Sequence, residues 1–299
     1  MLTSISFLAS DLSQLPQKKS YGNDAVEAIL FNESQLESNI WVESWKNIEH
    51  ATKIYGNKNV TFHFPMNGSD YSYDARIYKR LVEAYKRAID LGIAGVVVHS
   101  NLIREIDTWK KYQVTAEQRR IGEKLLNVVS RFPKSDTWLG LENMPIVGNF
   151  GKDTDPLFCF EEDFFNLPDE IGIVWDVCHS SSTQAYIKES NESNSIKNLI
   201  ARDINGLDIS LEKIIDRITH WHFAAFQGLN NPIKKTVCVE GVLPGEGYFD
   251  KLYYEKLVDY INSYSPSSRI INFEVIEDNY QQRKRAKSIV SWYKELTIN

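Results

Sequence analysis

The segment 172–180 limits the possible folds of this chain more than any other. It reads Gly-Ile-Val-Trp-Asp-Val-Cys-His-Ser, so an apolar, β-favouring run ends in Asp176 and, three residues later, in His179. A short apolar run of this kind predicts a buried strand. A single Asp or His after such a run is more often a helix cap or a satisfied core residue than a functional group. The pattern recurs along the chain, however, and the recurrence indicates a site built from strand ends.

Eight strand-like runs are spaced along the 299 residues. They cover 1–10, 26–31, 59–65, 93–99, 138–143, 171–177, 219–223 and 269–275. Patterns typical of helices lie between them, over 41–55, 73–91, 115–132, 210–218, 251–264 and 281–296. Thr115, with Gln118 three residues later, predicts a capping box that opens the third of these helices. Eight strands alternating with helices over this length predict a (β/α)8 TIM barrel.

The competing architecture is a doubly wound open sheet. That fold favours a glycine-rich phosphate-binding turn after an early strand, and the sequence has none. No linker or change of composition divides the chain, so we expect a single domain over residues 1–299. The segment 191–205 is polar and rich in Asn and Ser, which favours a loop, and the sequence leaves open whether it forms a lid.

Composition favours an ordinary globular protein of the cytoplasm. The net charge of −6 disfavours nucleic acid and anionic membranes as partners, although it leaves a local basic groove possible. The three cysteines are odd in number and widely spaced, which suits a reducing compartment. The first ten residues lack the basic start of a signal peptide, and no apolar run reaches membrane-spanning length. The sequence leaves the oligomeric state open, a homo-oligomer included.

In a TIM barrel the active site lies at the carboxyl ends of the strands. The chain has metal-competent side chains at six of these ends, namely His63, His99, Glu142, Asp176 with His179, His222 and Glu274. Converging carboxylates repel one another and are costly to bury, and a divalent cation supplies the missing charge. The sequence therefore predicts a metal site.

Taken singly, several of these residues have simpler explanations. His63 and His99, each taken alone, are more readily explained as core or substrate-contacting residues than as ligands, and Asp176 alone could cap a helix. His220 shares a strand face with His222 and is expected deeper in the interior, with a hydrogen-bond partner. Taken together, however, the four residues Glu142, Asp176, His222 and Glu274 have no comparably good structural explanation.

These residues occur in short motifs on successive predicted strands. The motifs are His63-Phe64-Pro65, Val98-His99, Leu141-Glu142-Asn143, Asp176-Val177-Cys178-His179, His222, Pro244-Gly245-Glu246-Gly247 and Phe273-Glu274. In this order they resemble the xylose-isomerase-like barrel superfamily, which includes sugar isomerases and epimerases and the endonuclease IV repair enzymes (AP endonuclease family 2). The resemblance covers nearly the whole chain as strand order and motifs, without close sequence identity.

The isomerase and epimerase branch implies one divalent metal, held by Glu142, Asp176, His222 and Glu274. Three carboxylates and one imidazole suit Mn²⁺, Mg²⁺ or Co²⁺. The metal would chelate the carbonyl and a hydroxyl of a small sugar or polyol and stabilise an enediolate, with Glu142 and Glu274 as acid/base partners and His179 contacting the substrate. Further candidate substrate contacts are Trp175, Trp221, Glu240 and Glu246.

The endonuclease-like branch implies two or three metals, Zn²⁺ among the candidates, and hydrolysis of a phosphodiester. His63, His99 and a bridging Glu142 would complete a second site, and His179 would belong to a third. The chain departs from the repair enzymes at that third site, because 237–244 offers Glu240 but no histidine to join His179.

The acidic net charge, and the lack of an obvious basic, aromatic loop that could read DNA, also disfavour the endonuclease branch. A catalytically inactive binding protein would be expected to have a broken ligand set, whereas the four-ligand set is intact. We therefore expect a metal-dependent sugar or polyol isomerase or epimerase, with the metal-dependent hydrolase as the alternative and the inactive barrel ranked last.

Overall fold

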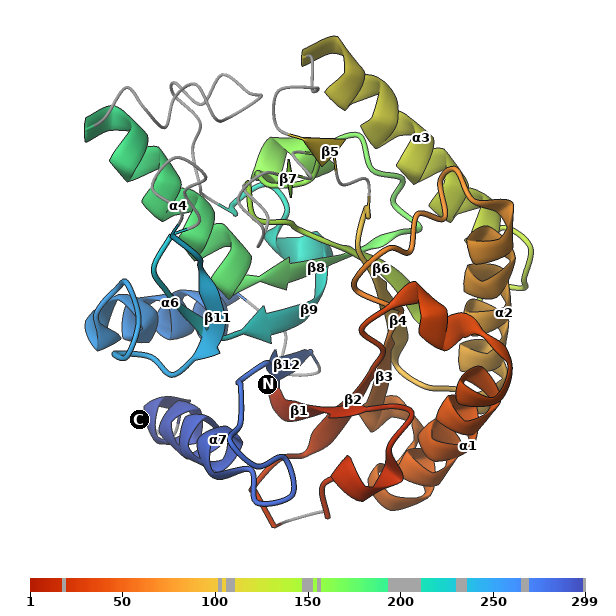
Figure 1. The fold of residues 1–299 in the computed structure, drawn as a ribbon, viewed down its shortest axis with the longest axis horizontal. Helices are drawn as coiled ribbons and strands as arrows, with labels where there is room; N and C mark the ends of the chain where they lie inside the picture. Colours follow the sequence, from red (N-terminus) through yellow and green to blue (C-terminus); the bar gives the residue numbers. More distant parts are fainter. Residues whose placement is uncertain are drawn as a thin grey trace.

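The computed structural model describes residues 1–17, 20–101, 104–105, 111–146, 153–154, 157–192, 211–229, 236–264 and 269–297. Eight parallel strands close into a barrel, and helices surround it (Figure 1). The barrel strands are β1 (Leu2–Leu8), β2 (Ala25–Ile29), β3 (Val60–His63), β4 (Gly95–Val98), β6 (Trp138–Glu142), β8 (Gly172–Asp176), β9 (Ile218–Phe223) and β12 (Ile270–Phe273). They follow one another around the barrel in chain order, and β12 pairs with β1 to close it. The predicted TIM barrel is confirmed.

The helices are α1 (Ser38–Tyr55), α2 (Ala75–Leu91), α3 (Lys111–Val129), α4 (Val177–Glu192), α6 (Lys251–Tyr264) and α7 (Lys284–Thr297). Helix α2 shows why the sequence encodes these boundaries. The Asp74 side chain accepts the N–H groups of Arg76 and Ile77, and Gly92 ends the helix in the left-handed conformation. Within the described residues, no helix is both long enough and apolar enough to cross a membrane.

Two helix predictions were wrong. Helix α3 begins at Lys111, so Thr115 lies inside the helix and does not cap it, and the Gln118 side chain contacts Asp163 instead. The segment 210–218, described from residue 211, contains only the 3-10 turn Ile215–Arg217, because the chain enters β9 directly at Ile218. Most of the polar segment 191–205 lies outside the described residues.

Among the described residues, two short antiparallel pairs lie outside the barrel sheet. Strand β5 (Arg104–Glu105) pairs with β7 (Asp153–Thr154), and β10 (Ala225–Gln227) pairs with β11 (Val239–Val242). The β10–β11 pair follows β9 and includes Glu240. The eight-strand prediction does not include these pairs.

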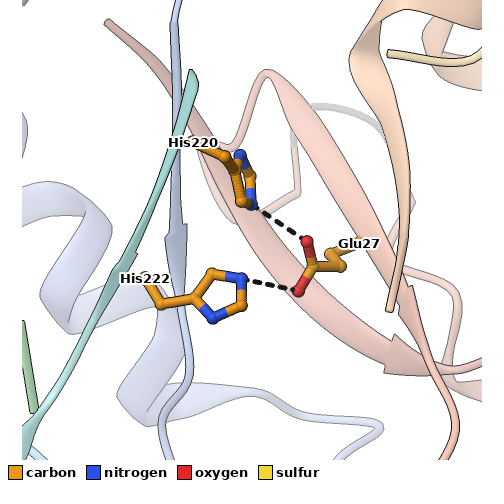
Figure 2. A group of neighbouring side chains, drawn as sticks. All are labelled: Glu27, His220 and His222. Carbon is orange, nitrogen blue, oxygen red and sulfur yellow. Dashed lines mark hydrogen bonds and ion pairs between the residues drawn. The ribbon is translucent and has the colours of Figure 1, made fainter. Parts of the chain in front are cut away.

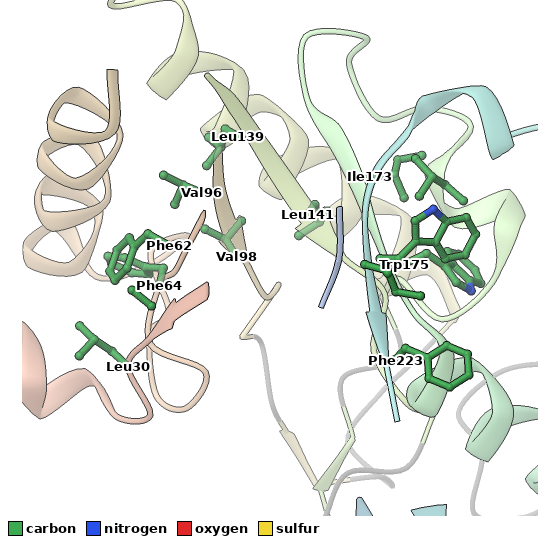
Figure 3. Close-up of a cluster of buried hydrophobic side chains, with 14 of the residues drawn as sticks. Leu30, Phe62, Phe64, Val96, Val98, Leu139, Leu141, Ile173, Trp175 and Phe223 are labelled. Carbon is green, nitrogen blue, oxygen red and sulfur yellow. The ribbon is translucent and has the colours of Figure 1, made fainter. Parts of the chain in front are cut away.

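Side chains alternate between the two faces of each barrel strand. The outward-facing set is apolar and packs between the strands and the surrounding helices, as Figure 3 shows for Phe62, Val96, Leu139 and Ile173. Full burial of such a side chain stabilises the folded state by roughly 1.5–3 kcal/mol. This apolar layer outside the strands stabilises the barrel, so the inward-facing positions can be polar.

The inward-facing set is unusually polar in the middle of the barrel. Glu27 of β2, Thr61 of β3, His220 of β9 and Asn272 of β12 are all fully buried there. Figure 2 shows Glu27 facing both His220 and His222 across the barrel. Because a charged group is costly to bury without partners, this layer must be organised by its own hydrogen bonds.

Candidate metal centre

The predicted ligands meet at the carboxyl ends of the barrel strands. His63, Glu142 and Asp176 are the last residues of β3, β6 and β8, while His99 and Glu274 directly follow β4 and β12. Asp176 pairs in register with His222 of the neighbouring strand β9. Because the carboxyl ends of all barrel strands lie at the same end of the barrel, residues far apart in sequence form one cluster.

One group of ligands surrounds the Nδ1 atom of His222. This atom lies 3.1 Å from Glu142 Oε1, 3.6 Å from Glu274 Oε1 and 4.0 Å from Asp176 Oδ2. The ligand atoms of Glu142, Asp176 and His222 all lie within 4.8 Å of one another, the spacing of a metal-binding group. Three carboxylates and one imidazole suit Mn²⁺, Mg²⁺ or Co²⁺.

A second group lies on the other oxygen of Glu142. Its Oε2 is 3.0 Å from His63 Nε2 and 3.1 Å from His99 Nε2. The Nδ1 atoms of the two rings face the backbone carbonyls of Phe64 and Met66, at 2.6 and 3.2 Å. A carbonyl only accepts hydrogen bonds, so each Nδ1 carries a proton. Each Nε2 faces the Glu142 carboxylate and would be the ligand atom for a cation bound there.

This orientation is typical of metal-binding histidines, which commonly donate their second N–H to a backbone carbonyl or a carboxylate. The ligand atoms of His63, His99 and Glu142 also lie within 4.8 Å of one another. Two imidazoles and a carboxylate suit Zn²⁺ as well as Mn²⁺ or Co²⁺. Glu142 therefore belongs to two adjacent groups, each of which fits a divalent cation.

Asp176 combines two tasks. Its Oδ1 accepts the backbone N–H of His179 at 2.6 Å, which caps the start of α4, and its Oδ2 faces His222. The Asn143 side chain fixes Asp176 further, because it bonds both the backbone N–H and the carbonyl of that residue. The cap and the ligand, considered as alternatives from the sequence, are thus both present.

His179 lies beside the cluster and, like His63 and His99, turns its Nδ1 atom toward a backbone carbonyl. Its Nδ1 donates to the backbone carbonyl of Asn143 at 2.8 Å, and its Nε2 lies 3.8 Å from Glu240 Oε2. Glu240 thus belongs to the site through β11, although no second histidine joins it among the described residues. The two side chains are 10% and 27% exposed, so the pair lies partly open to solvent.

The electrostatics of the cluster are strongly coupled. Burial alone would raise the pKa of Glu142, but His222 and His99 outweigh that effect and hold the pKa well below its usual range. Burial likewise would lower the pKa of His222, but Glu142, Glu274 and Glu27 raise it well above 6.5. Burial raises the pKa of Glu274 to about 8, with Glu142 adding to the shift. In the absence of a metal, protons on His222 and Glu274 therefore balance negative charge that a bound cation would otherwise balance.

Trp175 and Trp221 do not join this cluster. They pair in register with each other on the outward faces of β8 and β9, and they line a cavity together with Tyr253 and Leu257 of α6. Strand alternation places the two indoles on the outer face of the sheet, whereas Asp176 and His222 lie on the inner face. The position of Trp175 and Trp221 therefore does not support the expected contact with a sugar. Glu246 is also outside the cluster, at the surface, where it forms an ion pair with Arg285.

Glu27 is a residue of the site region that the strand-end pattern does not identify, because it lies in the middle of β2. Its signal in the sequence is a lone carboxylate within the apolar run Val26–Leu30. Burial alone would raise the pKa of Glu27, but the charge of His222 and the hydrogen bond from His220 outweigh it and hold the pKa well below its usual range. The expected partner of His220 is this carboxylate, at 2.9 Å.

A closed parallel barrel with histidines and carboxylates converging at the carboxyl ends of its strands defines a TIM barrel with a candidate metal centre. The chain belongs to the xylose isomerase-like TIM barrel family, whose model matches residues 17–296. A comparison with curated proteins found no match.

Solved structures of this fold are similar over the full length of the chain. A D-tagatose 3-epimerase-like protein is 19% identical with a TM-score of 0.57, covering 100% of this chain and 98% of that one. The 3-keto-D-glucoside 4-epimerase of E. coli is 14% identical with a TM-score of 0.56, covering 99% of each. Endonuclease IV from Thermus thermophilus is 10% identical with a TM-score of 0.59, covering 99% of this chain and 100% of that one. At these identities the likeness is one of fold.

Proposed function

We propose that this protein is a divalent-metal-dependent isomerase or epimerase acting on a small sugar or polyol. The observation that carries the proposal is the convergence of Glu142 and Glu274, from the separate strands β6 and β12, on Nδ1 of His222 at 3.1 and 3.6 Å. Moving a hydrogen between neighbouring carbons needs one group to take a proton and one to return it. Two glutamates from separate strands, both close to one point, would meet that need.

A bound divalent ion would neutralise the converging carboxylates and polarise a substrate carbonyl. Glu142, Asp176, His222 and Glu274 would hold it. Glu274 is the more exposed of the two glutamates, with 23% of its side chain exposed against 1% for Glu142, so a substrate would reach it first. We assign the proton transfers to Glu142 and Glu274, and substrate orientation to Nε2 of His179 with Glu240 beside it.

Hydrogen exchange tests this proposal without the true substrate. We expect the Mn²⁺-loaded protein in D₂O to incorporate deuterium next to the carbonyl of at least one member of a ketohexose and ketopentose panel, observed by NMR. Glu274→Gln should reduce the rate by about 100-fold or more, because general acid–base groups contribute typically 10²–10⁴-fold. Glu49→Gln is the control, since that exposed side chain pairs with Lys53 on helix α1 and belongs to none of the candidate groups. Equal exchange in wild type and Glu274→Gln would exclude this role.

A second candidate is a metal-dependent phosphodiester hydrolase with two ions. The observation that favours it is the pair His63 and His99, whose Nε2 atoms both lie on the second oxygen of Glu142. Two adjacent metal sites sharing a carboxylate are suited to phosphoester hydrolysis. The net charge of −6 remains unfavourable for a nucleic-acid substrate.

Hydrolysis of bis(p-nitrophenyl) phosphate in Zn²⁺ or Mn²⁺ tests the second candidate. The hydrolase hypothesis predicts turnover that His63→Ala with His99→Ala abolishes while the hydrogen-exchange assay shows no activity. Turnover that is absent from the wild type, or unchanged in the double variant, would contradict it. The two assays therefore separate the two chemistries.

A further inference from the structure

Glu27 occupies the centre of the polar layer directly beneath the candidate metal centre. Its carboxylate accepts the Thr61 hydroxyl at 2.8 Å, Nε2–H of His220 at 2.9 Å and the Asn272 amide at 3.0 Å. Its Oε1 also lies 3.1 Å from Nε2 of His222 (Figure 2). All five residues are fully buried, so these contacts are made in a region of low dielectric where charge interactions are strong.

His222 therefore has a carboxylate on each side of its ring. Nδ1 faces Glu142 and Glu274 in the candidate metal centre, while Nε2 faces Glu27. A neutral imidazole carries one proton, and the nitrogen that keeps it is chosen by the partner of that nitrogen. Without a metal, Nδ1 also faces an acceptor, Glu142 Oε1, at 3.1 Å. With a cation at Nδ1, the one proton of a neutral ring must lie on Nε2, where the Glu27 carboxylate is the anionic group that favours it.

We propose that Glu27 is a positioning residue, which holds the ring of His222 in the tautomer and orientation that present Nδ1 to a divalent cation. The inference rests on the metal centre of the proposed function. It extends that centre to strand β2, which contributes none of the ligands. The contact with His222 is a close ion pair whose N–H is not aligned for a hydrogen bond, so Glu27 acts on the ring through its charge and its close approach.

The alternative is that Glu27, His220 and His222 bind an ion of their own, since their ligand atoms also lie within 4.8 Å of one another. Two observations disfavour this. The carboxylate of Glu27 already has three hydrogen-bond donors besides His222, and His222 would have to bridge two ions through both ring nitrogens. A ligand histidine supported by a buried carboxylate is the common arrangement in metalloproteins.

The rest of the layer holds Glu27 in place. His220 donates Nε2–H to Glu27, and its ring packs 5.4 Å from that of Trp138. The indole of Trp138 fills the barrel interior so closely that a Cβ on Gly95 would lie 2.0 Å from it. The close packing of His220 and Trp138 therefore fixes the position of the Glu27 carboxylate next to His222.

The test is the affinity for Co²⁺, measured by competition with a chromophoric chelator, together with the visible absorption spectrum of the Co²⁺-loaded protein. We expect Glu27→Gln to weaken Co²⁺ binding by about tenfold to 100-fold, the usual effect of removing a group that orients a ligand. The Co²⁺ bands should shift as well, because His222 changes orientation. Glu27→Ala should weaken binding further, so Gln gives a partial rescue.

Asp163→Asn is the matched control. It makes the same carboxylate-to-amide change at another buried position, where the side chain accepts the N–H groups of Cys159 and Phe160 away from the centre. Its Co²⁺ affinity and spectrum should equal those of the wild type. Circular dichroism of each metal-free variant identifies any that fail to fold. If Glu27→Ala does not fold, the test is the comparison of Glu27→Gln with the wild type.

Three outcomes would overturn the inference. Unchanged Co²⁺ affinity and spectrum in Glu27→Gln would remove the positioning role while leaving the proposed metal centre intact. Loss of one whole Co²⁺ equivalent per chain, with the remaining ion unaffected, would make Glu27 a ligand instead. A wild type that binds no Co²⁺ would contradict the proposed function itself, and the inference with it.

Discussion

At the scale of single residues, His222 and Glu274 determine how protons and a metal compete for this centre. The pKa of His222 is raised well above 6.5 by the surrounding carboxylates, and burial raises that of Glu274 to about 8. Both groups are therefore protonated at neutral pH when no metal is bound. A metal ligand must first lose its proton, so a cation displaces protons from this site.

This competition predicts that metal affinity rises with pH up to about 8. Binding should be much weaker at about pH 6, where both groups hold their protons, than at about pH 8, and calorimetry in buffers of different ionisation enthalpy should detect proton release. The opposite sign applies to stability without metal. A group whose pKa is raised by folding contributes stability that is lost as pH rises through the folded pKa. The metal-free protein should therefore lose stability between about pH 5 and pH 8. Affinity independent of pH would contradict this assignment of protons.

At the scale of elements, the junction of β8 and α4 connects the fold to the site. The strand ends at Asp176, and the helix begins at the next residue, Val177. Asp176 caps the helix with one oxygen and faces His222 with the other. The local structure and the candidate metal centre thus depend on two atoms of one carboxylate.

Two substitutions separate these tasks. Asp176→Asn keeps a good helix cap but removes the charge, whereas Asp176→Ala removes both. We expect both variants to lose metal affinity, and we expect only Asp176→Ala to lose about 1 kcal/mol of unfolding free energy in the metal-free state. Urea unfolding of the chelator-treated proteins measures this difference. Equal stability of the Asn and Ala variants would show that the cap contributes nothing.

At the scale of the whole molecule, the barrel and its ligand cluster could be predicted because both follow from strand ends. An apolar run reports a buried strand, and a parallel barrel brings all carboxyl ends to one mouth. His63, Glu142 and Asp176 could thus be grouped before any contact was known. Alternation could have excluded Trp175, since it is one residue from the inward-facing Asp176.

Other features depend on contacts that the sequence does not report. Glu27 and His220 are 193 residues apart and meet only because β2 and β9 face each other across the barrel. Helix α3 begins at Lys111, four residues before the Thr115 and Gln118 pattern that predicts its start. The proton positions on His63 and His99 follow from the carbonyls of Phe64 and Met66, which only the folded backbone presents to them.

The most direct test of the metal centre is elemental analysis of protein purified without chelator or added metal. We predict at least one divalent ion per chain, retained in the His63→Ala, His99→Ala double variant and lost in an Asp176→Ala, His222→Ala double variant. A second ion, lost with the two histidines, would favour the dinuclear hydrolase. No bound ion, even after loading with Mn²⁺ or Zn²⁺, would contradict the assignment of Glu142, Asp176, His222 and Glu274 as a metal site.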